Sequence, residues 1–263
     1  MAGRSRNLAG LLSGIHSPTK EKIRNRHAAR RSAGRAGREQ QAAVIDRLIT
    51  LAHVAAGTIV LVVAPLALIT LKGGSWHKRW GRFFAFAMCG VLGTSLFMWQ
   101  PHRHVFLLAL AVVCAYLIYE GYRVIARRRT AIDKRADAFD LSAATLVLLS
   151  SAALFVIAVT AQTPLMHSIT SILMALAAIG AIFAALDIRA VCSGARTRLG
   201  SLLMHISAMI AAYISAVTAF CVINFHDVPM NLRWIVPSAV GSTIIAYFSV
   251  QYRKKIARRK HAG

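Results

Sequence analysis

Long runs of apolar residues, separated by short polar and basic segments, repeat seven times along this chain. Each run has about twenty residues, the length that a helix needs to cross roughly 30 Å of hydrocarbon. Apolar residues lie on every side of each predicted helix, and the runs are too continuous for alternating strands. The pattern predicts an all-α fold, a polytopic transmembrane bundle of about seven spans. We place the spans at residues 48–71, 81–100, 105–125, 141–162, 168–190, 199–223 and 233–251.

The composition supports a membrane protein and argues against one alternative. Of the 263 residues, 57% are hydrophobic, and the mean hydropathy is +0.55. A formal charge of +23 would suit nucleic acid, but nearly all basic residues stand in short clusters between the apolar runs. We therefore expect the lipid bilayer as the partner, with anionic headgroups at the basic loops, and no nucleic acid.

The chain divides by composition into three parts. Residues 1–47 are basic and polar and predict a disordered tail, with a surface helix as an alternative within it. Residues 48–251 hold the spans, and residues 252–263 form a basic C-terminal tail. Four scattered cysteines form no paired motif, so we expect them to pack as small apolar residues.

The loop charges predict which side of the membrane each loop faces. Nineteen lysines and arginines follow the first, third, fifth and seventh spans, whereas the opposite loops hold only Arg103 and Arg233. Positive residues favour the cytoplasmic side, so we expect a cytoplasmic C-terminus. The N-terminal tail disagrees, because its eleven basic residues raise the opposite total to thirteen. We interpret it as dispensable or as a start-site artefact; an Arg-rich targeting segment and an incomplete span are the alternatives.

Ionisable residues inside the spans are candidates for function, because charge in hydrocarbon is costly. Glu120, Asp187 and His205 fall near the cytoplasmic ends of their helices, and His77 joins them from the first cytoplasmic loop. We therefore predict one polar layer at that depth. Its members are His77, Glu120, Arg123, Asp187, Arg189 and His205.

Other histidines are predicted at the opposite, outer face. His53 lies near that face within the first span, and His104 follows the second span in a short loop. Two histidines at matched depth on different helices are suited to ligate haem iron axially, as His77 and His205 would. In that interpretation His53 and an outer histidine such as His104 form a second pair, and the protein is a haem-binding or quinone-coupled electron carrier.

The polar layer has other interpretations. Histidines with carboxylates suit a transition metal, a proton relay, or a small polar ligand or ion. A structural layer is the favoured one, with Glu120 close in sequence to Arg123 and Asp187 close to Arg189. No catalytic signature is present, so an enzyme is disfavoured. Asp140, just before the fourth span, predicts a helix N-cap.

Several short motifs follow one another in a particular order. They are His53-Val-Ala-Ala-Gly57, Pro65-Leu-Ala-Leu68, the stretch from Lys72 to Arg82, Tyr116 to Arg123, Asp187-Ile-Arg189, and His205 to Met209 followed by Tyr213, Thr218, Ala219 and Phe220. Over about residues 48–251 this order resembles a bacterial family of predicted multi-pass membrane proteins of unknown function. Ala208 departs from it, where a basic residue is expected. The resemblance implies the bacterial cytoplasmic (inner) membrane and singles out His53, His77 and His205.

Overall fold

The computed structural model describes residues 18–98, 105–126, 134–160, 164–193 and 198–261. Within these ranges the chain forms seven helices and no strand. Each helix contains a stretch long and apolar enough to cross a membrane, so the predicted class of fold is confirmed and the chain is an integral membrane protein. The helices are α2 (Pro18–Ile69), α3 (Ser75–Phe97), α4 (Val105–Ala126), α5 (Lys134–Thr160), α6 (Pro164–Cys192), α7 (Arg198–Asn224) and α8 (Met230–His261).

Helices extend beyond the predicted spans at both ends of the chain. Residues 18–47, predicted as a disordered tail, form the first part of α2, and the basic residues after 251 continue α8 to His261. Alanine, arginine, lysine and glutamine favour helix without apolar burial, and Arg35 pairs with Glu39 one turn away at 3.0 Å. The chain divides between Thr50 and Leu51 into two units, and the bundle is the second unit.

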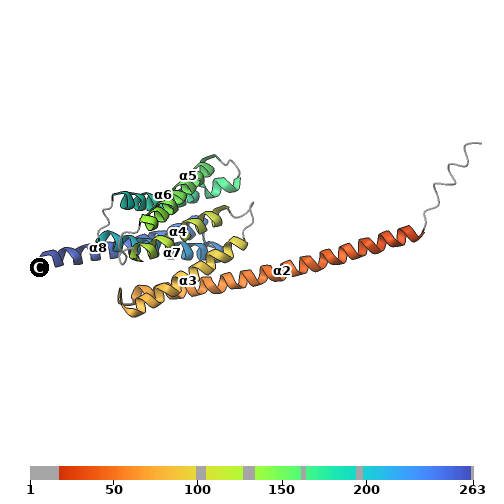
Figure 1. The fold of residues 1–263 in the computed structure, drawn as a ribbon, viewed down its shortest axis with the longest axis horizontal. Coiled ribbons are helices and arrows are strands. Elements are labelled where there is room, and N and C mark those ends of the chain that lie inside the picture. The colour runs from red at the N-terminus through yellow and green to blue at the C-terminus, as the bar shows by residue number, and fades with distance from the viewer. Residues whose placement is uncertain (1–17, 99–104, 127–133, 161–163, 194–197, 262–263) are drawn as a thin grey trace, which may run out of the picture. The chain divides into compact units, whose positions relative to one another are not determined.

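Helix α4 is the centre of the bundle, because it contacts α3, α5, α6 and α7. Helix α8 packs against α7, and α5 packs closely against α6. Figure 1 shows these helices running alongside one another. One buried cluster joins four of them through Val60 of α2, Met88 of α3, Leu117 of α4 and Ala212 of α7. The inward faces of these four helices are therefore packed with apolar side chains.

Two glycines mark the closest helix contacts. A Cβ at Gly180 of α6 would overlap the Ser151 hydroxyl of α5, and a Cβ at Gly241 of α8 would overlap Ile214 of α7. Without a side chain, glycine lets two backbones approach, and such packing takes the place of the hydrophobic effect between helices in lipid.

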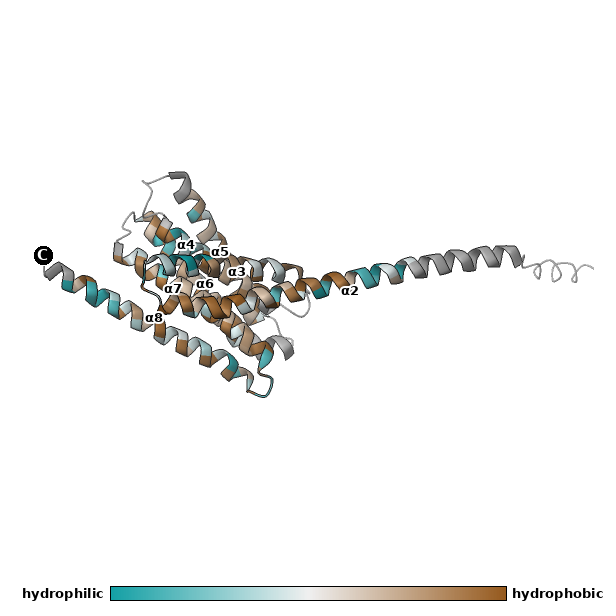
Figure 2. Ribbon diagram, turned by 90° about the horizontal axis from the view of Figure 1, so that it is seen from below, coloured by the Kyte–Doolittle hydropathy of each residue, from teal (hydrophilic) through white to brown (hydrophobic). Residues whose placement is uncertain are grey.

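The outer surface of the bundle is apolar. Large side chains such as Leu146 and Leu149 of α5 and Ile235 of α8 are exposed. In Figure 2 hydrophobic colours run along much of the bundle, and hydrophilic colours recur in the C-terminal part of α8. An apolar surface of this extent is costly in water and favourable in hydrocarbon, which agrees with the membrane assignment.

Candidate functional site

One end of the bundle contains a cavity of about 1240 Å³. We call this end the basic end; there α2, α4 and α8 end while α3 and α7 begin. Each of these five helices contributes to the wall, and the cavity lies wholly within the second unit of the chain. Its lining lysine, arginine and histidine residues are Lys72, His77, Lys78, Arg82, His205 and Lys255.

The two histidines of the cavity are held in the same way. His77 Nδ1 lies 3.0 Å from the carbonyl oxygen of Ala67, and His205 Nδ1 lies 2.6 Å from that of Gly121. A carbonyl oxygen only accepts, so each Nδ1 carries the proton and donates it. This arrangement leaves Nε2 of each ring as the nitrogen that can meet a ligand. Both rings line the same cavity.

The Lys72 side chain caps the C-terminal end of α2. Its Nζ donates to the carbonyl oxygens of Ala67, at 3.3 Å, and Leu68, and it lies 5.0 Å from the ring centroid of Phe248 on α8. The last carbonyls of a helix have no partner within it, so a lysine there satisfies them and the negative end of the helix dipole. Partial burial lowers the pKa of Lys72. Gly73, with φ of 81°, then turns the chain into α3.

The electrostatics of the cavity favour an anion. Lys78 and Arg82 stand one turn apart on α3, and Lys255 projects from α8. The first turn of α3, with its unpaired N–H groups, adds the positive end of a helix dipole. Among the lining residues in the described part of the chain none is acidic. The cations therefore have no counter-charge among the described residues of the cavity wall.

Apolar side chains make up most of the remaining wall. Leu68 from α2, Phe84 from α3, Ile206 from α7 and Ile256 from α8 all line the same cavity as the cations. The wall thus combines a charged part with a hydrophobic part, as a site for an amphipathic ligand would.

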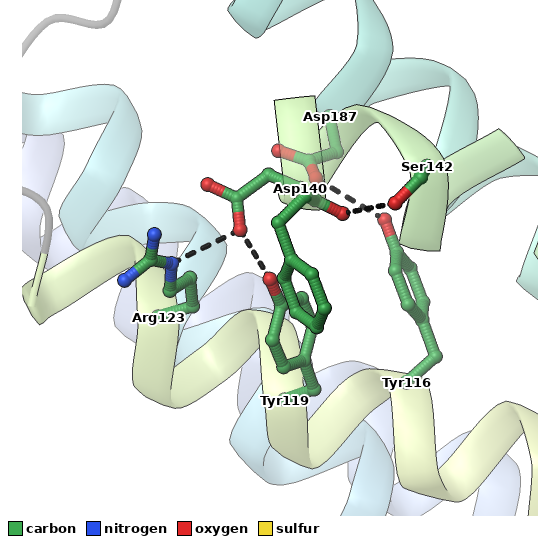
Figure 3. Close-up of polar contacts among 7 residues, drawn as sticks. Tyr116, Tyr119, Arg123, Asp140, Ser142 and Asp187 are labelled. Atoms are coloured by element: carbon green, nitrogen blue, oxygen red, sulfur yellow. Dashed lines mark hydrogen bonds and ion pairs between the residues drawn. The ribbon is translucent and has the colours of Figure 1, made fainter. Parts of the chain in front are cut away.

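The carboxylates belong to a separate cluster between α4, α5 and α6, shown in Figure 3. Arg123 Nε donates to Asp140 Oδ1 at 3.0 Å, and the Tyr119 hydroxyl donates to the same oxygen. Asp140 is fully buried within α5, which begins at Lys134. The predicted N-cap is therefore wrong, because the helix starts earlier among polar residues and Asp140 instead joins α5 to α4.

Asp187 joins α6 to α4. The Tyr116 hydroxyl lies 3.4 Å from Asp187 Oδ2, and Figure 3 shows Tyr116 and Asp187 facing one another. Asp187 is fully buried whereas Arg189 is exposed, because residues two apart point to different sides of a helix. Glu120 is also fully buried, one turn along α4 from Tyr116. The predicted polar layer is thus divided: the histidines line the cavity, and Arg123, Asp187 and Glu120 lie outside its lining.

The predicted pairing of the outer histidines stays a prediction, because only His53 of the two lies in the described part of the chain. His53 Nδ1 lies 2.8 Å from the Thr94 hydroxyl, which itself donates to the carbonyl of Gly90, so His53 connects α2 to α3. His104 lies outside the described residues. No group of three or more metal-ligating side chains is found in the ranges that the structure describes.

Two features of the site could not be predicted from the sequence. The cavity cations Lys72, Lys78, Arg82 and Lys255 appear in the sequence only as loop charges, and their convergence depends on which helices are neighbours. Asp140 lies 21 residues from Tyr119 in the sequence, so its role also depends on the packing of α5 on α4. Comparison with known protein families, curated proteins and solved structures finds no match to the chain.

Proposed function

We propose that this integral membrane protein binds a small anionic ligand in the cavity at its basic end. One observation carries the proposal: four cationic side chains and two histidines line the cavity, and none of the described lining residues is acidic. Uncompensated positive charge beside a low-dielectric wall attracts anions strongly. In this proposal the protein is not an enzyme, and the carboxylate cluster of α4, α5 and α6 is structural.

The setting of the cavity is part of the same proposal. The basic end faces the cytoplasm, because the positive-inside rule places the basic loops and the C-terminus there. The loops attract anionic lipid headgroups of that leaflet. The resemblance to bacterial multi-pass membrane proteins supports the inner membrane as the location, and nucleic acid has no part because the cations border helices that cross lipid.

The histidines refine how an anion would bind. With Nδ1 donating to a backbone carbonyl, an imidazole meets an anion through Nε2 only when that nitrogen is also protonated. When it carries that second proton, each ring offers an anion one charge-assisted hydrogen bond through Nε2.

Thermal unfolding in a neutral detergent tests the proposal, with inorganic phosphate as the probe and sodium chloride at equal ionic strength as the reference. Phosphate at ten times its dissociation constant stabilises the folded state by about 1.4 kcal/mol and so raises Tm. Lys78→Gln and Lys255→Gln should reduce that rise, whereas Arg79→Gln and Lys254→Gln should not. Arg79 and Lys254 are exposed neighbours outside the cavity lining and remove the same charge. Equal phosphate effects in the four variants would contradict the proposal.

Haem is a second candidate ligand, favoured by one observation. His77 and His205 come from different helices, line one cavity and donate Nδ1 to backbone carbonyls, as histidine ligands of metals commonly do. Bound haem would supply one-electron redox chemistry. Purified protein from cells supplied with haem should then show a Soret band that His205→Asn removes, since asparagine keeps the donor to Gly121 and lacks Nε2. A spectrum without that band excludes haem.

A further inference from the structure

We infer that the cavity at the basic end holds one anionic phospholipid, with its phosphate among Lys78, Arg82 and Lys255 and its acyl part against the apolar wall. The inference rests on the proposed anion binding and deepens it by naming the class of ligand. Size, wall chemistry and position in the fold each support it.

The volume of the cavity exceeds what a simple anion requires. At about 1240 Å³ it is larger than the roughly 300–1000 Å³ that encloses a drug-sized molecule. An inorganic anion would fill a small part of that space and leave the apolar wall wet. A ligand that satisfies the whole cavity therefore has a sizeable apolar part beside its charge.

The wall is arranged for an amphiphile. Charged side chains come from α3 and α8, while Leu68, Phe84 and Ile206 face the same space from α2, α3 and α7. Three tyrosines, Tyr122, Tyr213 and Tyr252, also line it and present an apolar ring with a polar tip, which is typical of the level of lipid headgroups. A small soluble anion would make no favourable contact with the hydrophobic part of this wall.

The position of the cavity points to the bilayer as the source. It opens among the ends of helices that cross the membrane, where Lys78 and Arg82 stack one turn apart along α3. Basic pockets between transmembrane helices near the cytoplasmic face bind anionic lipid headgroups. The lining cations have no acidic partner among the described lining residues, so a lipid phosphate would supply the missing negative charge.

Native mass spectrometry of the full chain, released from a neutral detergent, tests this directly. The probes are dioleoyl phosphatidylglycerol and, as a neutral lipid of equal chain length, dioleoyl phosphatidylcholine. The wild type should retain one phosphatidylglycerol per chain, at least fivefold more often than phosphatidylcholine. Lys78→Gln with Lys255→Gln should abolish that preference, whereas the double control Arg79→Gln with Lys254→Gln, of equal net charge, should keep it. Equal retention by the two double variants overturns the inference.

A second pair of variants tests the apolar part. Ile256→Ser, in the cavity wall, should lower phosphatidylglycerol retention about threefold or more, whereas Val250→Ser, on an exposed part of the same helix, should leave it unchanged. The phosphate experiment distinguishes a failure of the lipid inference from a failure of the proposed anion binding. If phosphate raises Tm through Lys78 and Lys255 but phosphatidylglycerol is not retained, the inference of a bound lipid is contradicted, whereas the proposed anion binding is supported. If neither probe acts, both fail.

Discussion

The ion-pair partner of Arg123 could not be predicted from proximity in the sequence. Its nearest acidic residue along the chain is Glu120, yet its ion-pair partner is Asp140 on the next helix. Residues three apart on a helix lie about 60° apart around its axis, so the two side chains need not meet. The presence of ionisable side chains near one end of the spans follows from hydropathy alone. Their partners depend on helix packing, which hydropathy does not contain.

The Arg123–Asp140 pair gives the first prediction. Asp140 is fully buried and the Arg123 side chain is 30% exposed, so removing the arginine takes a counter-charge away from a buried carboxylate. We expect Arg123→Met to destabilise the protein by about 2–4 kcal/mol. Asp140→Leu should cost less, because the remaining arginine can reach water. Thermal or denaturant unfolding in detergent measures both.

The double variant Arg123→Met with Asp140→Leu serves as the control for that prediction. Without either charge, no uncompensated ion is left in the interior, so stability should recover to above that of Arg123→Met alone. Additive losses would show that the pair does not hold α4 to α5 in this way.

At the scale of helices, apolar runs predict the spans well and their ends poorly. All seven spans correspond to helices, but α5 begins at Lys134, before the predicted start at 141, and α2 begins at Pro18, before 48. Hydropathy reports where a helix enters lipid, and a helix made of charged residues and alanine continues in water without a change in backbone. For this reason hydropathy predicts a helix end at Asp140, which lies inside α5.

The contact between α7 and α8 gives the second prediction. Gly241→Ala places a methyl group against Ile214, and overpacking of a close helix contact costs about 1–3 kcal/mol. Adding Ile214→Ala makes room for that methyl and should restore part of the loss. Unfolding in detergent measures the series, with Gly93→Ala as the control because a Cβ there meets nothing within 4 Å. A loss at Gly93 equal to that at Gly241 would refute the packing argument.

For the whole molecule, the number of helices and the segregation of charge follow from the sequence, and the cavity does not. Lys72, Lys78 and Lys255 are assigned to one side of the membrane by the loop charges. Their convergence on one cavity requires α8 to lie beside α7, and the end of α8 to lie beside the end of α2. These helix contacts join residues that are far apart in the sequence, so no local sequence pattern predicts them.

The orientation of the molecule is the third prediction. A fluorescent protein fused after Gly263 should fluoresce, and alkaline phosphatase fused there should be inactive, because the C-terminus is expected in the cytoplasm. Phosphatase fused after Asp227, in the segment between α7 and α8, should be active, since that fusion point lies one span earlier. The reverse pattern at both fusion points would place the basic end outside.

Helix α8 follows the other four helices of the cavity wall in the sequence, which bears on how the cavity is assembled. Helix α8 packs chiefly on α7, and it supplies Phe248, Tyr252 and Lys255 to the cavity wall. Because synthesis proceeds from the N-terminus, this wall is the last to be inserted. Insertion of α8 would therefore also enclose the ligand proposed for this cavity.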